Sequence, residues 1–143
     1  MPYTSVIDVH VILHRNGEIV LLERQGTGYC DGMLHLPSGH LEEGEPSHEA
    51  AAREAREEIG VDIDPDHLTL AAVVHHRQDP GHARLGLFFL ATEWAGEPYN
   101  AEPDECGKLV WVDPRVLPSN TIAYPAEGVR AWLDGMPFTP HGW

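Results

Sequence analysis

The hydrophobic residues near the N-terminus follow the pattern of two antiparallel strands. Residues 6 to 13, V-I-D-V-H-V-I-L, are rich in β-branched side chains and partly alternate between apolar and polar positions. Asn16-Gly17 then gives a strong signal for a two-residue hairpin turn. Residues 18 to 24, E-I-V-L-L-E-R, continue the apolar pattern after this turn. The sequence therefore predicts a β-hairpin at the start of the chain.

A glycine-rich loop follows the hairpin. It has the sequence Q-G-T-G-Y-C-D-G at positions 25 to 32 and leads into M-L-H-L-P, a short predicted strand that Pro37 closes. The composition of Ser38-Gly39 predicts a second turn directly after this strand.

Two segments have the composition and spacing of helices. Residues 46 to 59 are strong helix formers, with Pro46 suited to the first helical position and Gly60 suited to the C-terminal stop. Residues 126 to 135 carry apolar side chains at helical spacing and predict a second helix.

Three further segments have the pattern of strands. Residues 68 to 77 and 84 to 94 are expected to pair around a turn at Asp79-Pro80-Gly81. A loop rich in proline, glycine and acid then leads to a last strand at 108 to 112. Strands interspersed with two helices predict a layered α/β fold whose sheet mixes parallel and antiparallel pairs.

Length and composition are those of an ordinary globular protein. The chain has 143 residues, 42% of them hydrophobic and 22% charged, so we expect a single domain over 1–143. No apolar run approaches the ~20 residues that span a bilayer, and the N-terminal sequence has no signal-peptide pattern. A cytoplasmic location is therefore expected. Cys30 and Cys106 are expected to be free thiols without chemistry.

The charge balance limits the partners. Twenty-three acidic and nine basic residues give a net charge of −14, which repels a nucleic-acid backbone or an anionic membrane over long range. We therefore expect neither broad nucleic-acid binding nor membrane binding. A small phosphate ligand is compatible with this charge if bound cations bridge it to the acidic surface. The sequence is compatible with a homodimer and does not fix the oligomeric state.

Three carboxylates crowd one face of the first predicted helix. At 100° per residue, Glu54, Glu57 and Glu58 fall within an arc of roughly 100°. Like charges at these spacings each cost roughly 0.2–0.5 kcal/mol. Arg53 can reach Glu57 and Glu49 on the same helix and hold them in place. The arrangement is explained either by a solvated acidic face or by a divalent cation that offsets the repulsion.

The residues before this helix support the second explanation, a bound divalent cation. Glu42, Glu43 and Glu45 lie on a glycine-flanked turn, so the turn and the helix together present a dense set of carboxylates. Hard oxygen ligands of this kind suit Mg²⁺ or Mn²⁺, which keep several waters and bridge to phosphate groups.

Residues 39 to 61, G-H-L-E-E-G-E-P-S-H-E-A-A-A-R-E-A-R-E-E-I-G-V, resemble the Nudix box. The pattern of that box is G-x5-E-x7-R-E-U-x-E-E-x-G-U, with U a bulky aliphatic residue. The matching positions are Gly39, Glu45, Arg53, Glu54, Glu57, Glu58, Gly60 and Val61. Ala55 is smaller than the usual aliphatic residue, and Ser38 stands in L-P-S-G where family members commonly have a glycine. The chain thus resembles the Nudix hydrolase superfamily.

This resemblance implies a fold and a chemistry. The fold is a Nudix α/β/α sandwich with a mixed β-sheet, and the reaction is the attack of an activated water on a phosphorus of a diphosphate linked to another group, X, with Mg²⁺ or Mn²⁺ as cofactor. The implied metal ligands are the carboxylates of Glu54, Glu57 and Glu58 and the main-chain carbonyl of Ser38. Glu54 and Glu57 are also implied in catalysis. Glu45 is implied as a supporting acid held by Arg53.

A downstream loop adds a further candidate. Residues 94 to 102, W-A-G-E-P-Y-N-A-E, resemble a loop of the mutator-type nucleotide pyrophosphatases that supplies a ligand or the general base. The resemblance implies Glu102 as a catalytic residue, with Asp104 and Glu105 as rivals. An ordinary acidic surface loop is the alternative.

Two residues resemble substrate contacts of related enzymes. Arg24 corresponds to an arginine that contacts phosphate, and Asn120, in L-P-S-N, to an asparagine that contacts a nucleobase. The alternatives are a surface arginine at a strand end and a plain turn residue. His75 and His76 end a predicted strand and face opposite sides, so one of them can line the cleft, with a purely structural histidine as the alternative. The tail T-P-H-G-W either folds over the cleft or frays.

The sequence therefore predicts a Mg²⁺-dependent Nudix hydrolase that cleaves a pyrophosphate bond in a nucleotide. A nucleoside triphosphate is the favoured substrate. ADP-ribose, sugar nucleotides, dinucleoside polyphosphates and a capped RNA end are also compatible, because the box handles only phosphate and metal. The alternative function is a non-catalytic Nudix domain that senses nucleotides.

Overall fold

The N-terminal hairpin forms as the sequence predicts. In the computed structural model, which describes residues 1–79 and 81–143, β1 (Val6–Arg15) pairs antiparallel with β2 (Glu18–Arg24). Asn16 and Gly17 connect them with φ angles of 53° and 79°. Two consecutive positive φ angles are those of a type I′ turn, whose twist matches the flanking strands.

The remaining elements alternate strands with two helices. They are β3 (Leu34–His35), β4 (Ser38–His40), α1 (Ser47–Ile59), the short 3₁₀ helix η1 (Pro65–His67), β5 (Thr69–Asp79), β6 (His82–Ala91), β7 (Cys106–Val112), α2 (Ala123–Asp134) and β8 (Phe138–His141). Pro80 of the predicted turn lies outside the described residues. Among the residues that the structure describes, no helix is long and apolar enough to cross a membrane.

Strand β1 lies at the centre of a mixed sheet. The strand order is β3-β2-β1-β6-β5-β8, with β4 paired to β1 and β7 paired to β2. β6 runs parallel to β1 from Val6 to Leu13, while β4 and β2 are antiparallel to opposite ends of β1 on its other side. Neighbours on both sides satisfy the backbone hydrogen bonds of β1 along much of its length.

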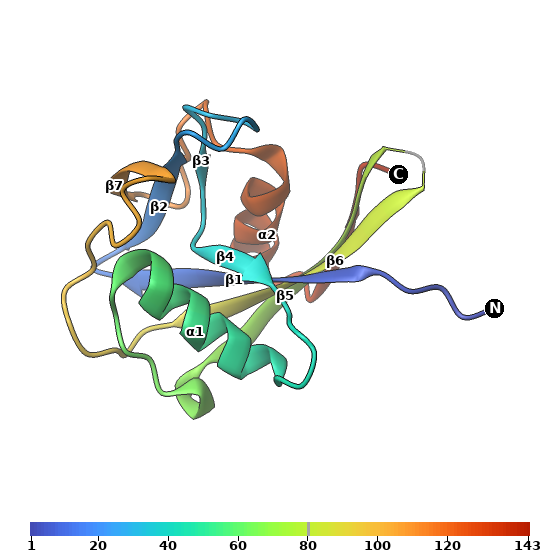
Figure 1. Cartoon of the computed structure of the whole chain (residues 1–143), viewed down its shortest axis with the longest axis horizontal. Coiled ribbons are helices and arrows are strands. Elements are labelled where there is room, and N and C mark those ends of the chain that lie inside the picture. The colour runs from blue at the N-terminus through green and yellow to red at the C-terminus, as the bar shows by residue number, and fades with distance from the viewer. Residues whose placement is uncertain (80) are drawn as a thin grey trace.

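The two helices cover opposite faces of this sheet. Val9, Val11 and Leu13 point from β1 into the core cluster under α1, whereas Ile12 points into the cluster under α2. Such alternation follows from the two-residue period of a strand. Figure 1 shows α1 in green and α2 in orange on opposite sides of β1. The prediction of an α/β/α sandwich with a mixed sheet is confirmed.

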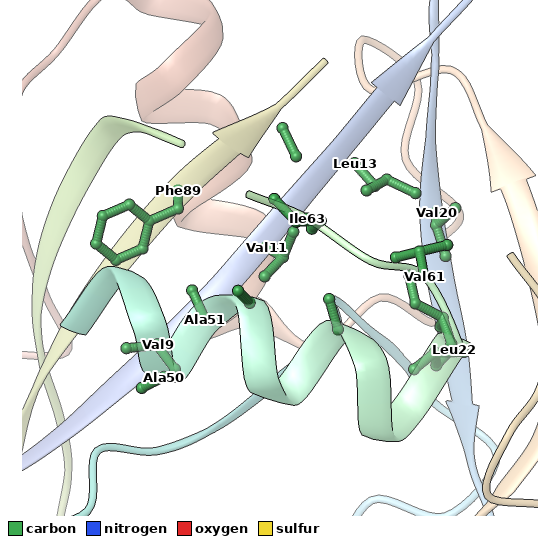
Figure 2. Close-up of a cluster of buried hydrophobic side chains, with 14 of the residues drawn as sticks. Val9, Val11, Leu13, Val20, Leu22, Ala50, Ala51, Val61, Ile63 and Phe89 are labelled. Carbon is green, nitrogen blue, oxygen red and sulfur yellow. The ribbon is translucent and has the colours of Figure 1, made fainter. Parts of the chain in front are cut away.

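Helix α1 approaches the sheet closely because its buried face is made of small side chains. The buried residues of this helix are Ala50, Ala51, Ala52, Ala55 and Ile59. Figure 2 shows Ala50 and Ala51 against the side chains that project from β1. Gly60 ends the helix in the left-handed conformation with φ 68°, and Pro46 precedes its first residue as N-cap, one position earlier than predicted. Glu54 and Glu58 lie beside this apolar stripe, where they contact β4.

Two local predictions were wrong. Ser38-Gly39 does not form a turn but belongs to β4, where Ser38 pairs with His10 of β1. The tail neither folds over a cleft nor frays, because β8 pairs in parallel with β5. In both places a short segment of turn-like composition finds hydrogen-bond partners on a strand that is distant in the sequence.

Candidate active site

Strand β4 brings its backbone against the acidic face of α1. The amide of Ser38 donates a hydrogen bond of 2.7 Å to Oε1 of Glu58. The carboxyl group of Glu54 lies against Gly39, where any Cβ would overlap it. Gly39 is therefore needed for the close approach of Glu54. Ser38 replaces the usual glycine without difficulty, because a β-strand backbone accepts any side chain.

Arg53 joins the acids of the helix to those of the preceding turn. Its Nε and Nη2 donate to the two carboxylate oxygens of Glu45, at 3.1 and 2.8 Å. Nη1 donates to Glu54 at 2.9 Å and to Glu57 at 3.3 Å. The predicted contact with Glu57 is present, whereas Glu49 is replaced as a partner by Glu45 and Glu54. This guanidinium holds three carboxylates and is not free to bind substrate.

The loop after β6 reaches the C-terminal end of α1. The amide of Tyr99 donates to the carbonyl of Ile59 at 3.0 Å, and the amide of Ala101 donates to the carbonyl of Glu58 at 3.1 Å. These bonds satisfy carbonyls that a helix end leaves without partners. Glu102 is the next residue of this loop, so its carboxyl group is held near the acids of α1.

Burial and crowding act on these carboxyl groups together. Burial raises the pKa of Glu58 well above its ordinary value, the Ser38 amide opposes this shift, and Glu54 and Glu102 add to it. Burial also raises the pKa of Glu54 in spite of the neighbouring Arg53. The pKa of Glu102 is raised mainly by burial. The cluster holds more negative charge than its arginine compensates.

The donor set suits a hard divalent cation. Four carboxyl groups and a main-chain carbonyl supply only oxygen, which is the chemistry of Mg²⁺ or Mn²⁺ sites. In the described residues no three acidic, histidine or cysteine side chains are already placed to hold one metal ion. Oxygens of Glu58 and Glu54 accept hydrogen bonds from the Ser38 amide and from Arg53. A cation bound to Glu54, Glu57 and Glu58 would replace these contacts and offset the repulsion.

A cavity of about 330 Å³ adjoins this cluster. It is lined by Ser38, Gly39 and His40 of β4 and by residues of β1, β5, β6 and α2. Its polar centre is the buried carboxylate of Asp8, which accepts from the Tyr124 hydroxyl at 3.0 Å and pairs with Arg84 at 3.1 Å. Ser38 and Gly39 line the cavity and also contact Glu58 and Glu54, so strand β4 lies between the cavity and the acids.

His10 is buried in the cavity wall without a hydrogen-bond partner. Neither ring nitrogen has one among the described residues, and the ring stacks on Phe88 with centroids 4.1 Å apart and planes 4° apart. Burial lowers the pKa of His10 to about 3, so the ring is uncharged at neutral pH. A buried imidazole without partners is costly to the fold.

The predicted substrate contacts both hold the glycine-rich loop. Nε of Arg24 donates to the carbonyl of Tyr29 at 2.8 Å, and Nδ2 of Asn120 donates to the carbonyl of Gly32 at 3.1 Å. Tyr29 lines the cavity, whereas neither Arg24 nor Asn120 is among its lining residues in the described chain. Their contacts with a substrate stay predictions.

Sequence reasoning missed most of the cavity. His76 lines it, as expected for one residue of the histidine pair, but Asp8, Arg84 and Tyr124 were not foreseen. The available signal was Asp8 and His10, two polar residues on one face of an otherwise apolar strand. Their partner Tyr124 comes from α2, far along the chain.

Comparisons with known proteins agree with this geometry. The sequence profile of the NUDIX domain matches residues 4–133. The chain is 34% identical over 106 residues to the 8-oxo-dGTP diphosphatase of Escherichia coli strain K12, covering 73% of this chain and 80% of that protein. It is 28% identical over 136 residues to phosphatase NudJ of the same strain, covering 90% and 84%.

Solved structures show the same fold. A MutT NUDIX hydrolase from Burkholderia pseudomallei superposes with a TM-score of 0.80 at 27% identity, covering 90% of this chain and 98% of that one. A MutT protein from Methanosarcina mazei Go1 superposes with a TM-score of 0.77 over 94% of this chain and 96% of that one, at 19% identity.

Proposed function

The chain belongs to the Nudix family, and we propose that it is a Mg²⁺-dependent hydrolase that cleaves a nucleoside triphosphate to the monophosphate and pyrophosphate. The observation that carries this proposal is the contact of Glu54 and Glu58 with the backbone of β4, with Glu57 and Glu102 beside them. The relatives named 8-oxo-dGTP diphosphatase and phosphatase NudJ support a phosphate substrate. Other diphosphates linked to a group X are the alternative substrates.

The proposed reaction forms one bond and breaks one. The oxygen of a water attacks one phosphorus of the anhydride, the bridging P–O bond breaks, and the other half leaves with the electron pair: pyrophosphate for attack at the α-phosphorus, or the nucleoside monophosphate for attack at the β-phosphorus. Mg²⁺ held by Ser38, Glu54, Glu57 and Glu58 would supply charge neutralisation and a more acidic water. Mn²⁺ is chemically suited to the same ligands.

Residues of the chain itself supply the general base and orient the attacking water. Glu54 is fixed by Gly39 and by Arg53, so its carboxylate can orient the water and accept its proton. A raised carboxyl pKa brings a base closer to neutral pH, where proton transfer is most effective. Glu102 is the second candidate for this role, and its raised pKa has the same effect.

A substrate panel tests the function. We expect Mg²⁺-dependent release of pyrophosphate from at least one nucleoside triphosphate in a panel that includes 8-oxo-dGTP, with ADP-ribose, sugar nucleotides and dinucleoside polyphosphates assayed beside it. Tight binding without product from any of these compounds would instead support a nucleotide sensor. Carrying out the reaction in ¹⁸O-labelled water identifies the phosphorus that is attacked, because the label enters only that product.

A substitution tests the site. Glu57→Gln is expected to lower kcat by about 10²-fold or more with the fold retained, because a charged ligand becomes neutral. Glu49→Gln is the matched control, since it removes an exposed carboxylate of α1 that has no place in the proposed site. Equal rates of Glu57→Gln and the parent would refute the role of Glu57.

The same proposal includes a setting for the protein. We propose a cytoplasmic protein that functions as one unit over residues 1–143, with the Nudix box at 39–61 and a small nucleotide as its partner. The free thiols of Cys30 and Cys106 support this location, because unpaired cysteines are usual in a reducing compartment.

A further inference from the structure

Strand β8 lies beyond the part of the chain that the family profile matches. The profile ends at residue 133, and β8 covers Phe138–His141. This strand extends the sheet beside β5, with Phe138 opposite Val73 and His141 opposite His76. Figure 1 shows the C-terminus next to the β5–β6 hairpin. The tail is thus an addition to the sheet next to the cavity.

The end of the tail is fixed at the residues after β8. Nε1 of Trp143 donates to the carbonyl of His75 at 2.8 Å. The guanidinium of Arg77 lies over the Trp143 ring, 4.6 Å from its centroid. Gly142 has a φ of 84°, and a Cβ there would overlap the carbonyl of Arg77. The left-handed backbone and the close approach both require glycine, so the tail has one defined position.

This position brings His141 behind the cavity wall, against His76, which lines the cavity. Nδ1 of His141 lies 2.9 Å from Nδ1 of His76, so one ring nitrogen donates a hydrogen bond and the other accepts it. His76 in turn stacks on Tyr124, with centroids 4.2 Å apart and planes 9° apart. His76 and Tyr124 both line the cavity, and the Tyr124 hydroxyl donates to Asp8 at 3.0 Å. His141 is therefore linked to Asp8 through two rings.

We propose that His141 is a positioning residue for the substrate, which holds the His76–Tyr124 pair as a wall against which the base of the nucleotide packs. In the described residues, the side chain of His76 forms one hydrogen bond, and its partner is His141. Without this bond the His76 ring can turn about its side-chain torsions and leave the wall. The inference rests on the proposed function for the identity of the ligand.

The expected effect is on substrate affinity and not on the chemical step. The acids of α1 are held by β4, Arg53 and the loop at 99–102, none of which His141 touches. His141→Ala is therefore expected to raise KM about threefold to tenfold, the range for one lost hydrogen bond, with kcat and the Tm close to those of the parent. His141→Asn is expected to restore KM, because its amide can take the place of Nδ1.

Phe138→Ala provides the matched control. Phe138 lies on the same strand with 52% of its surface exposed, and unlike His141 it forms no hydrogen bond with His76 in the described residues. This variant is expected to leave KM unchanged. An unchanged KM in His141→Ala, a failure of His141→Asn to restore KM, or an equal increase in Phe138→Ala would each overturn the proposal.

A binding measurement separates this inference from the proposed function. Calorimetry with the nucleoside monophosphate product needs no turnover, and His141→Ala is expected to weaken its binding by the same factor as KM. A parent protein that hydrolyses nothing in the panel would overturn the proposed function, and calorimetry would still decide the role of His141. Equal monophosphate affinity in parent and variant, or none in either, would overturn that role.

Discussion

The carboxyl group of Glu54 lies directly over the α-carbon of Gly39. A Cβ at position 39 would overlap the carboxyl carbon and both oxygens of Glu54. One residue earlier, the Ser38 amide binds the carboxylate of Glu58. Two consecutive backbone positions of β4 thus locate two acids of α1. The glycine that opens the Nudix box is explained here by this close approach, because strand β4 does not need its conformational freedom.

Gly39→Ala is expected to damage the site more than the fold. The new methyl group displaces the Glu54 carboxylate, and a misplacement of about 1 Å at a catalytic group lowers kcat/KM by roughly 10²-fold. The overlap lowers the free energy of unfolding by about 1–3 kcal/mol. Steady-state kinetics and urea unfolding measure the two effects. Gly107→Ala is the control, since its Cβ meets only the movable ends of Glu23 and Gln25. Parent-like kinetics in Gly39→Ala would contradict the account.

Arg53→Lys is expected to lower both stability and turnover although the charge is kept. An arginine reaches Glu45 with two nitrogens and Glu54 with the third, and an ammonium group cannot bridge the same acids. We expect a loss of about 1–2 kcal/mol in the free energy of unfolding and of about 10-fold or more in kcat. Arg56→Lys is the control because Arg56 forms an exposed pair with Asp62.

Arg53 and Glu45 are expected to be energetically coupled. The effects of Arg53→Lys and Glu45→Gln on unfolding are expected to be non-additive, because the two side chains contact each other. A double-mutant cycle measures the difference. Additive effects, or an equal loss in Arg56→Lys, would show that Arg53 does not organise the cluster.

The parts of the fold that sequence reasoning predicted are those that local chemistry decides. The hairpin at Asn16-Gly17 depends on adjacent residues, and the acidic face of α1 depends on helical spacing alone. Strands β4 and β8 were missed because each is short and gains its hydrogen bonds from a distant partner. The sequence of β8, F-T-P-H, also contains a proline. An edge strand accepts proline, but in a sequence pattern a proline argues against a strand.

The cavity was beyond sequence reasoning for the same physical reason. The helical pattern places Glu54, Glu57 and Glu58 on one face, but no periodicity shows that Asp8 meets Tyr124, which is 116 residues away. Burial on both faces of β1 also hides the polar positions within an apolar run. The acidic cluster therefore came from a motif, whereas the cavity required the folded chain.

His10→Leu is expected to stabilise the protein and to flatten its pH dependence. Burial lowers the pKa of His10 from 6.5 to about 3, so the unfolded state binds more protons below pH 6.5. The stability associated with neutral His10 is present above that pH and is lost as the pH falls towards 3, at about 1.4 kcal/mol per pH unit. Removal of the two unpartnered nitrogens adds about 1–3 kcal/mol at neutral pH.

Urea unfolding at pH 7.5 and pH 5 measures both effects of His10→Leu. The parent is expected to lose more free energy of unfolding between these pH values than the variant does. His67→Leu is the control because His67 is exposed near Asp64 and Glu93. If parent and His10→Leu lost stability in parallel on acidification, His10 would not be neutral in the folded state.

Glu58→Gln is expected to stabilise the protein without Mg²⁺ and to remove much of its response to Mg²⁺. Burial raises the pKa of Glu58, so its contribution to stability is present below its unfolded pKa and is lost as the pH rises through its folded pKa. At pH 8, where the carboxyl group is ionised in the unfolded chain, its burial therefore opposes folding, and neutral glutamine, whose oxygen can still accept from the Ser38 amide, is expected to raise the Tm by about 2–4 °C in EDTA.

The parent should show the opposite sensitivity to metal. A cation that binds only the folded state stabilises it by about 2.7 kcal/mol at 100 times its Kd, so the Tm of the parent is expected to rise with Mg²⁺ and that of Glu58→Gln to rise much less. Glu49→Gln should behave like the parent in both titrations, because its carboxylate lies outside the cluster. Equal responses of all three proteins would place the cation elsewhere, while a lower Tm of Glu58→Gln in EDTA would mean that the hydrogen bond from the Ser38 amide already compensates the buried charge.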